Sequence, residues 1–204
     1  MKLYDSKYLS VTSIVGLRAP FDDKAFKGWC SKNGKDASLI TSTSRVLGEK
    51  VSRWLEDSSY GLGDLLEPPI DELEERLKEG VEKFLNDWDI KEAEQEVVCK
   101  ELNYAGRYDG IIADKKGESL LVDFKTFGAW KDAPYKRDAK KIKHTRWQVS
   151  LYAHALGWED QLGVVIFKNN GDYEIQNLPI DMEMIGWVEK NQPLILKTIE
   201  EARK

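Results

Sequence analysis

Two short segments of the 204-residue chain hold side chains whose types and spacing suit metal-ion chemistry. They are residues 106–110, Gly-Arg-Tyr-Asp-Gly, and residues 121–126, Leu-Val-Asp-Phe-Lys-Thr. Asp-x-Lys occurs six times in the chain, but only Asp123 and Lys125 stand at the end of an apolar run typical of a strand. Residues two apart on a strand point to the same face. Asp123 and Lys125 are therefore predicted to project together from a rigid element, in a region where charged groups are costly to bury.

A third candidate, Asp109, is predicted on the neighbouring strand of the same hairpin. The turn sequence Asp-Lys-Lys-Gly at 114–117 lies nearly midway between Asp109 and Asp123, so folding back there brings the two carboxylates together. Two carboxylates at such a short distance repel each other unless they share a cation or a proton. Mg²⁺ prefers such oxygens together with water and phosphate, and Lys125 is placed to stabilise developing negative charge. The alternative is an Asp123–Lys125 salt bridge beside a surface Asp109, but all three on one hairpin favour the metal site.

Gln148 and Tyr152 follow on a predicted helix. They are four residues apart and so share one helix face. This face either contributes to the candidate site or packs against the sheet, and the two roles are compatible.

The elements that must position these residues are predicted to form one domain, residues 1–204. Residues 1–92 are predicted to be mainly helical, because apolar residues recur at helical spacing over 39–55 and 70–88. Residues 93–180 are predicted to form the sheet core with the hairpin. Residues 181–204 are predicted to form C-terminal helices interrupted at Pro193.

Five strands are predicted in the sheet core. They cover 94–103, 104–113, 118–126, 162–168 and 172–178, with a helix near 144–156 and a second turn signal at 169–172, Asn-Asn-Gly-Asp. The order of helices, strand meander, helix, two strands and helices predicts an α/β fold, with a central mixed sheet of about five strands flanked by helices.

Charge is distributed unevenly. The whole chain has a net charge of −5, yet residues 131–146 hold seven Lys or Arg against two Asp, a local net charge of +5. A basic segment on an acidic body is typical of a phosphate-binding surface, although a solvated helix face is the commoner meaning of such a run.

Several classes of protein are excluded by the composition. Two cysteines, Cys30 and Cys99, cannot build a disulfide framework or hold an iron–sulfur cluster. Together with His144 and His154 they match no zinc-site spacing, so packed or solvated roles are expected. No apolar run reaches the roughly 20 residues of a membrane span, and no secretory signal is visible, so we expect a soluble cytoplasmic protein without membrane contact.

The ordered set Gly-x-x-Asp, apolar-Asp-x-Lys-Thr and Gln-x-x-x-Tyr resembles the PD-(D/E)XK nuclease superfamily. Within it, the chain resembles the RecB-type branch that includes mitochondrial genome-maintenance exonucleases and their phage and bacterial relatives. The segment Tyr8–Val15, with its Ser-Val-Thr, resembles the opening common in that branch. The resemblance covers residues 8–156, and residues 104–152 are diagnostic.

The resemblance implies a role for each matching residue. Asp109 and Asp123 would be metal ligands, with the backbone carbonyl of Phe124 as a further ligand, and Lys125 would be the catalytic lysine. Gln148 and Tyr152 would shape the site and touch the nucleic-acid backbone. Residues of the basic run would also bind nucleic acid: Lys136, Arg137, Lys140, Lys141 and Arg146.

One position departs from the family pattern. Relatives carry a Gly-x-x-x-His helix that gives a histidine to the metal, whereas this chain reads Gly48-Glu49-Lys50-Val51-Ser52. Serine therefore stands in the histidine's place, and Glu49 and Glu96 are alternative carboxylates for the site.

Three interpretations of this sequence remain open. The first is a Mg²⁺- or Mn²⁺-dependent deoxyribonuclease, an exonuclease of replication, recombination or repair that acts on single-stranded DNA or on free ends and needs no iron–sulfur cluster. The second is a nuclease-like fold that only binds nucleic acid, which the missing histidine favours. The third is a globular domain in which the acidic pair has only a structural role. Trp130, Tyr135 and Trp147 interleave with the basic run and are candidates either for stacking on bases or for packing.

Overall fold

The computed structural model describes residues 3–4, 7–19, 27–28, 30–32, 34, 36–62, 68–127 and 139–203, and the account below concerns these. Lys136 and Arg137 of the basic run lie outside the described residues, as do Trp130 and Tyr135, and the side chain of Lys140 is not described.

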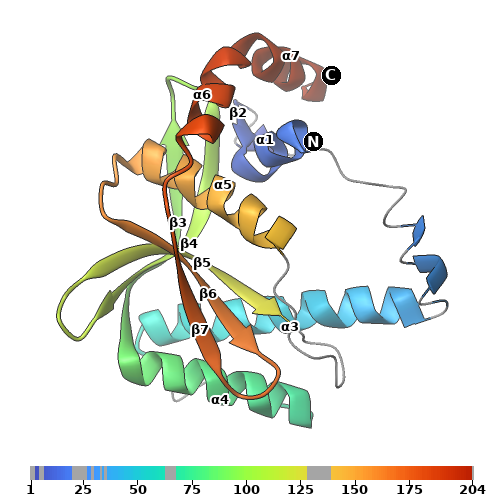
Figure 1. Ribbon diagram of the computed structural model, residues 1–204, viewed down its shortest axis with the longest axis vertical. Helices are drawn as coiled ribbons and strands as arrows, with labels where there is room; N and C mark the ends of the chain where they lie inside the picture. Colours follow the sequence, from blue (N-terminus) through green and yellow to red (C-terminus); the bar gives the residue numbers. More distant parts are fainter. Residues whose placement is uncertain are drawn as a thin grey trace.

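A mixed sheet of seven strands forms the centre of the molecule (Figure 1). The order is β1-β2-β4-β5-β6-β7, with β3 paired to the other edge of β4. The β2–β4 and β5–β6 pairs are parallel and the remaining pairs are antiparallel. The strands are β1 (Leu3–Tyr4), β2 (Tyr8–Ser10), β3 (Trp88–Cys99), β4 (Tyr104–Asp114), β5 (Ser119–Phe127), β6 (Gln161–Lys168) and β7 (Tyr173–Leu178).

Helices cover both faces of this sheet, and each face has its own apolar core. The first core joins α1, α5, α6 and α7 to the sheet, and the second joins α3 and α4 to the opposite face (Figure 1). The helices are α1 (Val11–Arg18), α3 (Asp36–Ser59), α4 (Glu72–Asp87), α5 (Ala139–Leu156), α6 (Met182–Lys190) and α7 (Gln192–Ala202). The predicted α/β class with helices flanking a mixed sheet is therefore confirmed.

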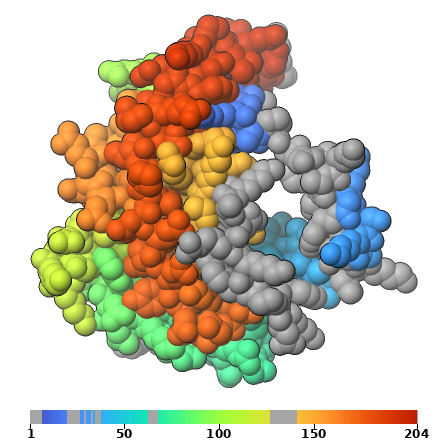
Figure 2. All heavy atoms as spheres, in the orientation of Figure 1, coloured from blue at the N-terminus to red at the C-terminus, as the bar shows by residue number. Residues whose placement is uncertain are grey.

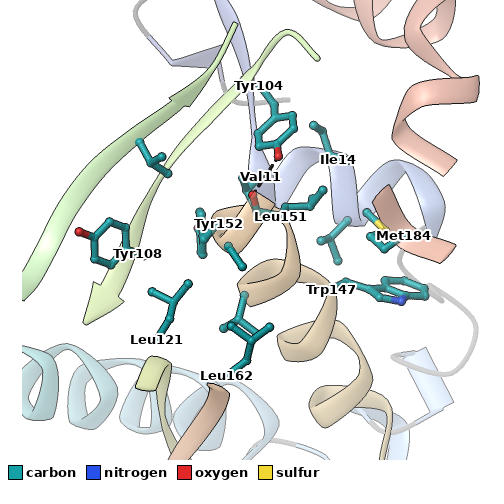
Figure 3. Packing of buried hydrophobic residues seen from close by; sticks show 14 of the residues in the cluster. Val11, Ile14, Tyr104, Tyr108, Leu121, Trp147, Leu151, Tyr152, Leu162 and Met184 are labelled. Carbon is teal, nitrogen blue, oxygen red and sulfur yellow. Dashed lines mark hydrogen bonds between the residues drawn. The ribbon is translucent and has the colours of Figure 1, made fainter. Parts of the chain in front are cut away.

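Helix α5 lies at the centre of the first core (Figure 3). Tyr104 is fully buried, and its hydroxyl donates a hydrogen bond of 2.8 Å to the backbone carbonyl of Leu151. Because a buried hydroxyl needs such a partner, this bond fixes α5 against β4. Trp147 and Met184 lie together at the other end of the same core (Figure 3).

Both predicted turns are present. The backbone carbonyl of Asp114 accepts a hydrogen bond of 3.0 Å from the N–H of Gly117. Gly117 has φ +90°, a left-handed conformation that glycine adopts without strain. Gly171, in the turn between β6 and β7, has φ +83°. At the C-terminus, the predicted interruption at Pro193 is confirmed, because Pro193 stands in the first turn of α7.

The N-terminal third differs from the prediction of a mainly helical segment. Strands β1 and β2 precede α1, and β2 pairs in parallel with β4 through Leu9↔Tyr104 and Ser10↔Ala105. β3 begins at Trp88, six residues before the predicted strand, and α5 begins at Ala139 instead of residue 144. Strands of two or three residues carry no period of their own, so pairing with a distant strand decides their conformation.

Cys30 and Cys99 are both free thiols, and Cys99 is buried. Within the described part of the chain, no helix is both long enough and apolar enough to span a bilayer. In the space-filling view, β6 and β7 and the C-terminal helices form a continuous surface on one side of the molecule (Figure 2).

Candidate active site

The site begins where β4 and β5 separate. The last paired residues of these two strands are Gly110 and Val122, which are the sequence neighbours of Asp109 and Asp123. On the same edge of β4, β2 pairs only with Tyr104 and Ala105, so residues 106–109 lie between the β2 ladder and the β5 ladder. At this point the Asp109 side chain replaces a backbone partner: its Oδ2 accepts the N–H of Phe124 at 2.8 Å. That bond holds the two strands together at the predicted carboxylate pair.

Asp123 and Lys125 lie beside this bond. Asp123 is 3% exposed, and its Oδ2 forms an ion pair with the ammonium of Lys125. Lys125 also lies 3.4 Å from the carbonyl oxygen of Phe124. The carboxylates, the carbonyl and the lysine predicted from the sequence are thus gathered within one short stretch of β4 and β5.

The electrostatics reflect the crowding. Burial and the nearby charge of Asp123 raise the pKa of Asp109 to about 7, although Lys125 and the Phe124 N–H act in the opposite direction. Burial alone would lower the pKa of Lys125, but the charges of Asp123 and Asp109 outweigh it and the pKa is raised. Lys125 is therefore protonated at neutral pH, and the burial and crowding of Asp109 favour its protonated form when no cation is present.

A cleft of about 700 Å³ opens over Asp109, Phe124 and Lys125, whereas Asp123 is buried and does not line it. It is bounded by α3 on one side and α5 on the other, with β3, β4 and β5 between them. Its lining residues are Ser44, Arg45, Gly48, Glu49, Val51, Ser52, Arg53, Glu56, Glu94, Arg107, Asp109, Phe124, Lys125, Thr126, Lys141, His144, Thr145 and Gln148.

Helix α3 forms the first wall of the cleft. It carries Ser52, the position at which the sequence departs from the pattern of the resembling family. Ser52 and Glu49 both line the cleft, so serine stands where the resemblance places a histidine ligand. Glu49 is exposed, with Arg45 Nε 3.7 Å from its Oε1. A buried ion pair of 2.5 Å between Lys50 and Glu74 ties α3 to α4, which fixes the position of this wall.

The carboxylate that β3 contributes to the cleft is Glu94, two residues from the predicted Glu96. Glu96 is exposed and does not line the cleft. Glu94 has φ 52°, an uncommon left-handed backbone conformation, and its Oε2 lies 2.7 Å from Arg107 Nε. Burial and the charges of Glu56 and Asp123 raise the pKa of Glu94, while Arg107 opposes this shift. The period-two pattern of a strand does not reveal such a local change of backbone.

Helix α5 forms the second wall, and it separates the two residues of the Gln-x-x-x-Tyr pair. Gln148 lines the cleft, whereas Tyr152 is buried outside it and packs on β4. The reason is Gly106: a Cβ there would lie 2.8 Å from Cε1 of Tyr152. Tyr152 therefore fixes the distance between α5 and β4 beside Asp109.

Arg146 of the basic run and the neighbouring Trp147 lie away from the cleft. Arg146 forms an ion pair of 2.9 Å with the buried Asp181 at the start of α6 and does not line the cleft. Trp147 is 4% exposed, with the Arg18 guanidinium 4.6 Å from its ring centroid, so it is a packing residue and not a surface for stacking bases. Lys141 does line the cleft.

The donor set fits a hard cation that keeps several waters. Two carboxylates and a backbone carbonyl, completed by water and a substrate phosphate, are the ligands that Mg²⁺ and Mn²⁺ accept. The raised pKa of Asp109 reports a repulsion that a cation would relieve. In the part of the chain that the structure describes, no three His, Cys, Asp or Glu side chains are gathered closely enough to hold a metal alone, so water and substrate would have to complete the coordination.

No protein-family model matches the chain. No curated protein matches it either. Among solved structures, a candidate exonuclease from Eubacterium rectale is 16% identical, with a TM-score of 0.55 over 100% of this chain and 88% of the other. An alkaline exonuclease from Laribacter hongkongensis is 11% identical over 96% and 89%, with a TM-score of 0.49. The protein SSO0001 is 17% identical over 95% and 78%, with a TM-score of 0.48. The first of these shows that the chain has the fold of that candidate exonuclease, while the RecB-type branch stays a prediction.

Proposed function

We propose that this protein is a Mg²⁺- or Mn²⁺-dependent deoxyribonuclease that removes nucleotides from DNA ends. The observation that carries the proposal is the hydrogen bond of 2.8 Å from the Phe124 N–H to Asp109, which lies at the floor of an open cleft with Lys125, and Lys125 pairs with the buried Asp123 behind it. A purely structural salt bridge would not need the second carboxylate, whose raised pKa shows that its charge is unfavourable there.

Each residue has a defined task in this proposal. Asp109, Asp123 and the Phe124 carbonyl would hold the metal ion. The ion, when bound, supplies Lewis-acid stabilisation of charge on the phosphate oxygens. Lys125 is held by Asp123 and remains protonated, so it stabilises negative charge near phosphorus and orients the attacking water instead of acting as a base.

The DNA strand would be gripped by the α5 wall and by the basic run that precedes it. Gln148 and Lys141 line the cleft and offer an amide and a cation to the backbone. Lys136, Arg137 and Lys140 stand just before them in sequence and would add phosphate contacts. We place this activity in replication, recombination or repair, where single-stranded DNA and free ends occur.

A second function is favoured by one specific observation. Ser52 lines the cleft at the place of the expected histidine ligand, so the site lacks one donor that its relatives would use. A nuclease fold that binds DNA and cleaves it weakly or not at all is the alternative that this position supports.

Cleavage of labelled DNA separates the two. Linear oligonucleotides labelled at the 5′ or the 3′ end, single- or double-stranded, are incubated with Mg²⁺, with Mn²⁺ or with EDTA, and circular single-stranded DNA serves as the matched control. We expect metal-dependent release of short products from linear DNA and an intact circle. A cut circle would replace exonuclease by endonuclease, and binding without cleavage under every condition would favour the second function.

A further inference from the structure

Thr145 stands out among the residues of the cleft wall. Its side chain is 1% exposed, and it lies on α5 one turn before Gln148. Its Oγ1 has no hydrogen-bond partner among the described residues. A buried hydroxyl without a partner is costly, and such groups in folded proteins call for an explanation.

The usual partner of a helical threonine is the carbonyl one turn earlier. Thr198 on α7 shows this arrangement, with its Oγ1 donating to the carbonyl of Leu194 at 2.8 Å. Ser58 does the same on α3, at 2.7 Å from the carbonyl of Trp54. Thr145 lacks this bond although its helix provides a carbonyl at the corresponding position. Its hydroxyl therefore remains available for a group that is not part of the described protein.

The surroundings of Thr145 indicate what that group would be. Lys141, Thr145 and Gln148 are spaced at i, i+4 and i+7 and line the cleft along one face of α5. The cleft floor opposite this face carries Asp109 and Lys125. His144 also lines the cleft and stacks on Trp147 of the same helix, with ring centroids 5.4 Å apart and the rings inclined by 21°.

We propose that the Thr145 hydroxyl donates a hydrogen bond to a phosphate oxygen of the bound nucleic-acid strand, which makes Thr145 a substrate-binding residue of the α5 wall. The inference rests on the proposed nuclease function and adds to it a contact that the sequence motifs do not identify. Threonine in helices populates two χ1 rotamers, so the hydroxyl can turn toward a phosphate that enters the cleft. The hydroxyl suits this task, because a neutral donor recognises phosphate without adding charge next to Lys125.

Thr145→Val tests the inference, because valine has nearly the same shape and lacks the hydroxyl. Affinity is measured by fluorescence anisotropy with a fluorescein-labelled single-stranded oligonucleotide, with Ca²⁺ in place of Mg²⁺ to limit cleavage. Losing one hydrogen bond to a charged group should weaken binding by about 10- to 100-fold. Single-turnover cleavage in Mg²⁺ at DNA concentrations below saturation should fall by the same factor as the affinity, since a contact present throughout the reaction contributes to binding. Thr145→Ser should restore affinity.

Stability distinguishes binding from a structural role. Thr145→Val removes an unsatisfied buried hydroxyl, so its Tm should rise by about 2 °C or more. The matched control is Thr198→Val, which loses a bond that is present on α7 and should lower Tm while leaving DNA affinity unchanged. Unchanged affinity in Thr145→Val, or a fall in its Tm like that of the control, would overturn the inference and leave the nuclease proposal standing. Wild-type protein that neither binds nor cleaves the oligonucleotide would overturn both.

Discussion

Asp109→Asn should make the metal-free protein more stable at alkaline pH, although it removes a proposed metal ligand. In the folded protein, burial and the charge of Asp123 raise the pKa of Asp109 from 3.8 to about 7. Between these two pH values the folded state binds more protons than the unfolded state. Stability therefore falls as the pH rises through this window, and the loss is complete above about pH 7. Asparagine keeps an oxygen that can accept the Phe124 N–H but carries no charge.

The magnitude follows from the two pKa values. A difference of about three pH units corresponds to about 4 kcal/mol of unfolding free energy, which is an upper limit because Lys125 and Asp123 respond to the same charge. The free energy of unfolding of Asp109→Asn should thus exceed that of the wild type by up to about 4 kcal/mol at pH 8 and by little at pH 4.

Urea unfolding in EDTA, followed by circular dichroism at pH 4, 6 and 8, measures this difference. The matched control is Asp89→Asn on β3, where the side chain is 72% exposed and pairs only with Lys91 among the described residues, so its stability should change little at any pH. Added Mn²⁺ should stabilise the wild type more than Asp109→Asn, because metal binding to the folded state raises its stability. If Asp109→Asn were no more stable than the wild type at pH 8, the carboxylate repulsion described above would be refuted.

Three further variants test how the cleft is built. Ser52→His places an imidazole on the α3 wall, so its affinity for Mn²⁺, measured by calorimetry, should equal or exceed that of the wild type. Weaker Mn²⁺ binding by a folded variant would mean that this position does not face the metal. Gly106→Ala puts a Cβ 2.8 Å from the Tyr152 ring and should cost about 1–3 kcal/mol in urea unfolding, whereas an unchanged midpoint would show that α5 is not held at this distance. Lys50→Met leaves the buried Glu74 without its ion-pair partner and should cost about 3 kcal/mol in urea unfolding at pH 7, whereas an unchanged midpoint would show that this ion pair does not stabilise the contact between α3 and α4.

The hairpin with its acidic pair was predictable because its determinants are local. The turn at 114–117 and the apolar run before Asp123 fix which residues face each other, and the structure brings Asp109 next to Phe124 as the turn requires. Two strongly periodic helices, α3 and α4, were predictable for the same reason.

The remaining features depend on contacts between distant segments. β2 exists through its pairing with β4, almost 100 residues away, and no pattern in three residues predicts that. Glu94 enters the cleft through a left-handed backbone conformation, and Thr145 is notable for a missing bond; neither leaves a signal in the sequence. For Tyr152, the motif correctly predicts a position on the helix, but the ring packs on Gly106 and does not line the cleft.

Single-turnover cleavage by Lys125→Met tests the central claim most directly. Methionine keeps much of the length and apolar stem of lysine but removes the charge that Asp123 holds beside the Phe124 carbonyl. With saturating end-labelled single-stranded DNA and Mg²⁺, we expect the wild type to cleave and Lys125→Met to lose at least about 100-fold in rate, with an unchanged circular-dichroism spectrum at the assay temperature and undiminished DNA affinity. A variant that cleaves at the wild-type rate would contradict the assignment of this cluster as the active site.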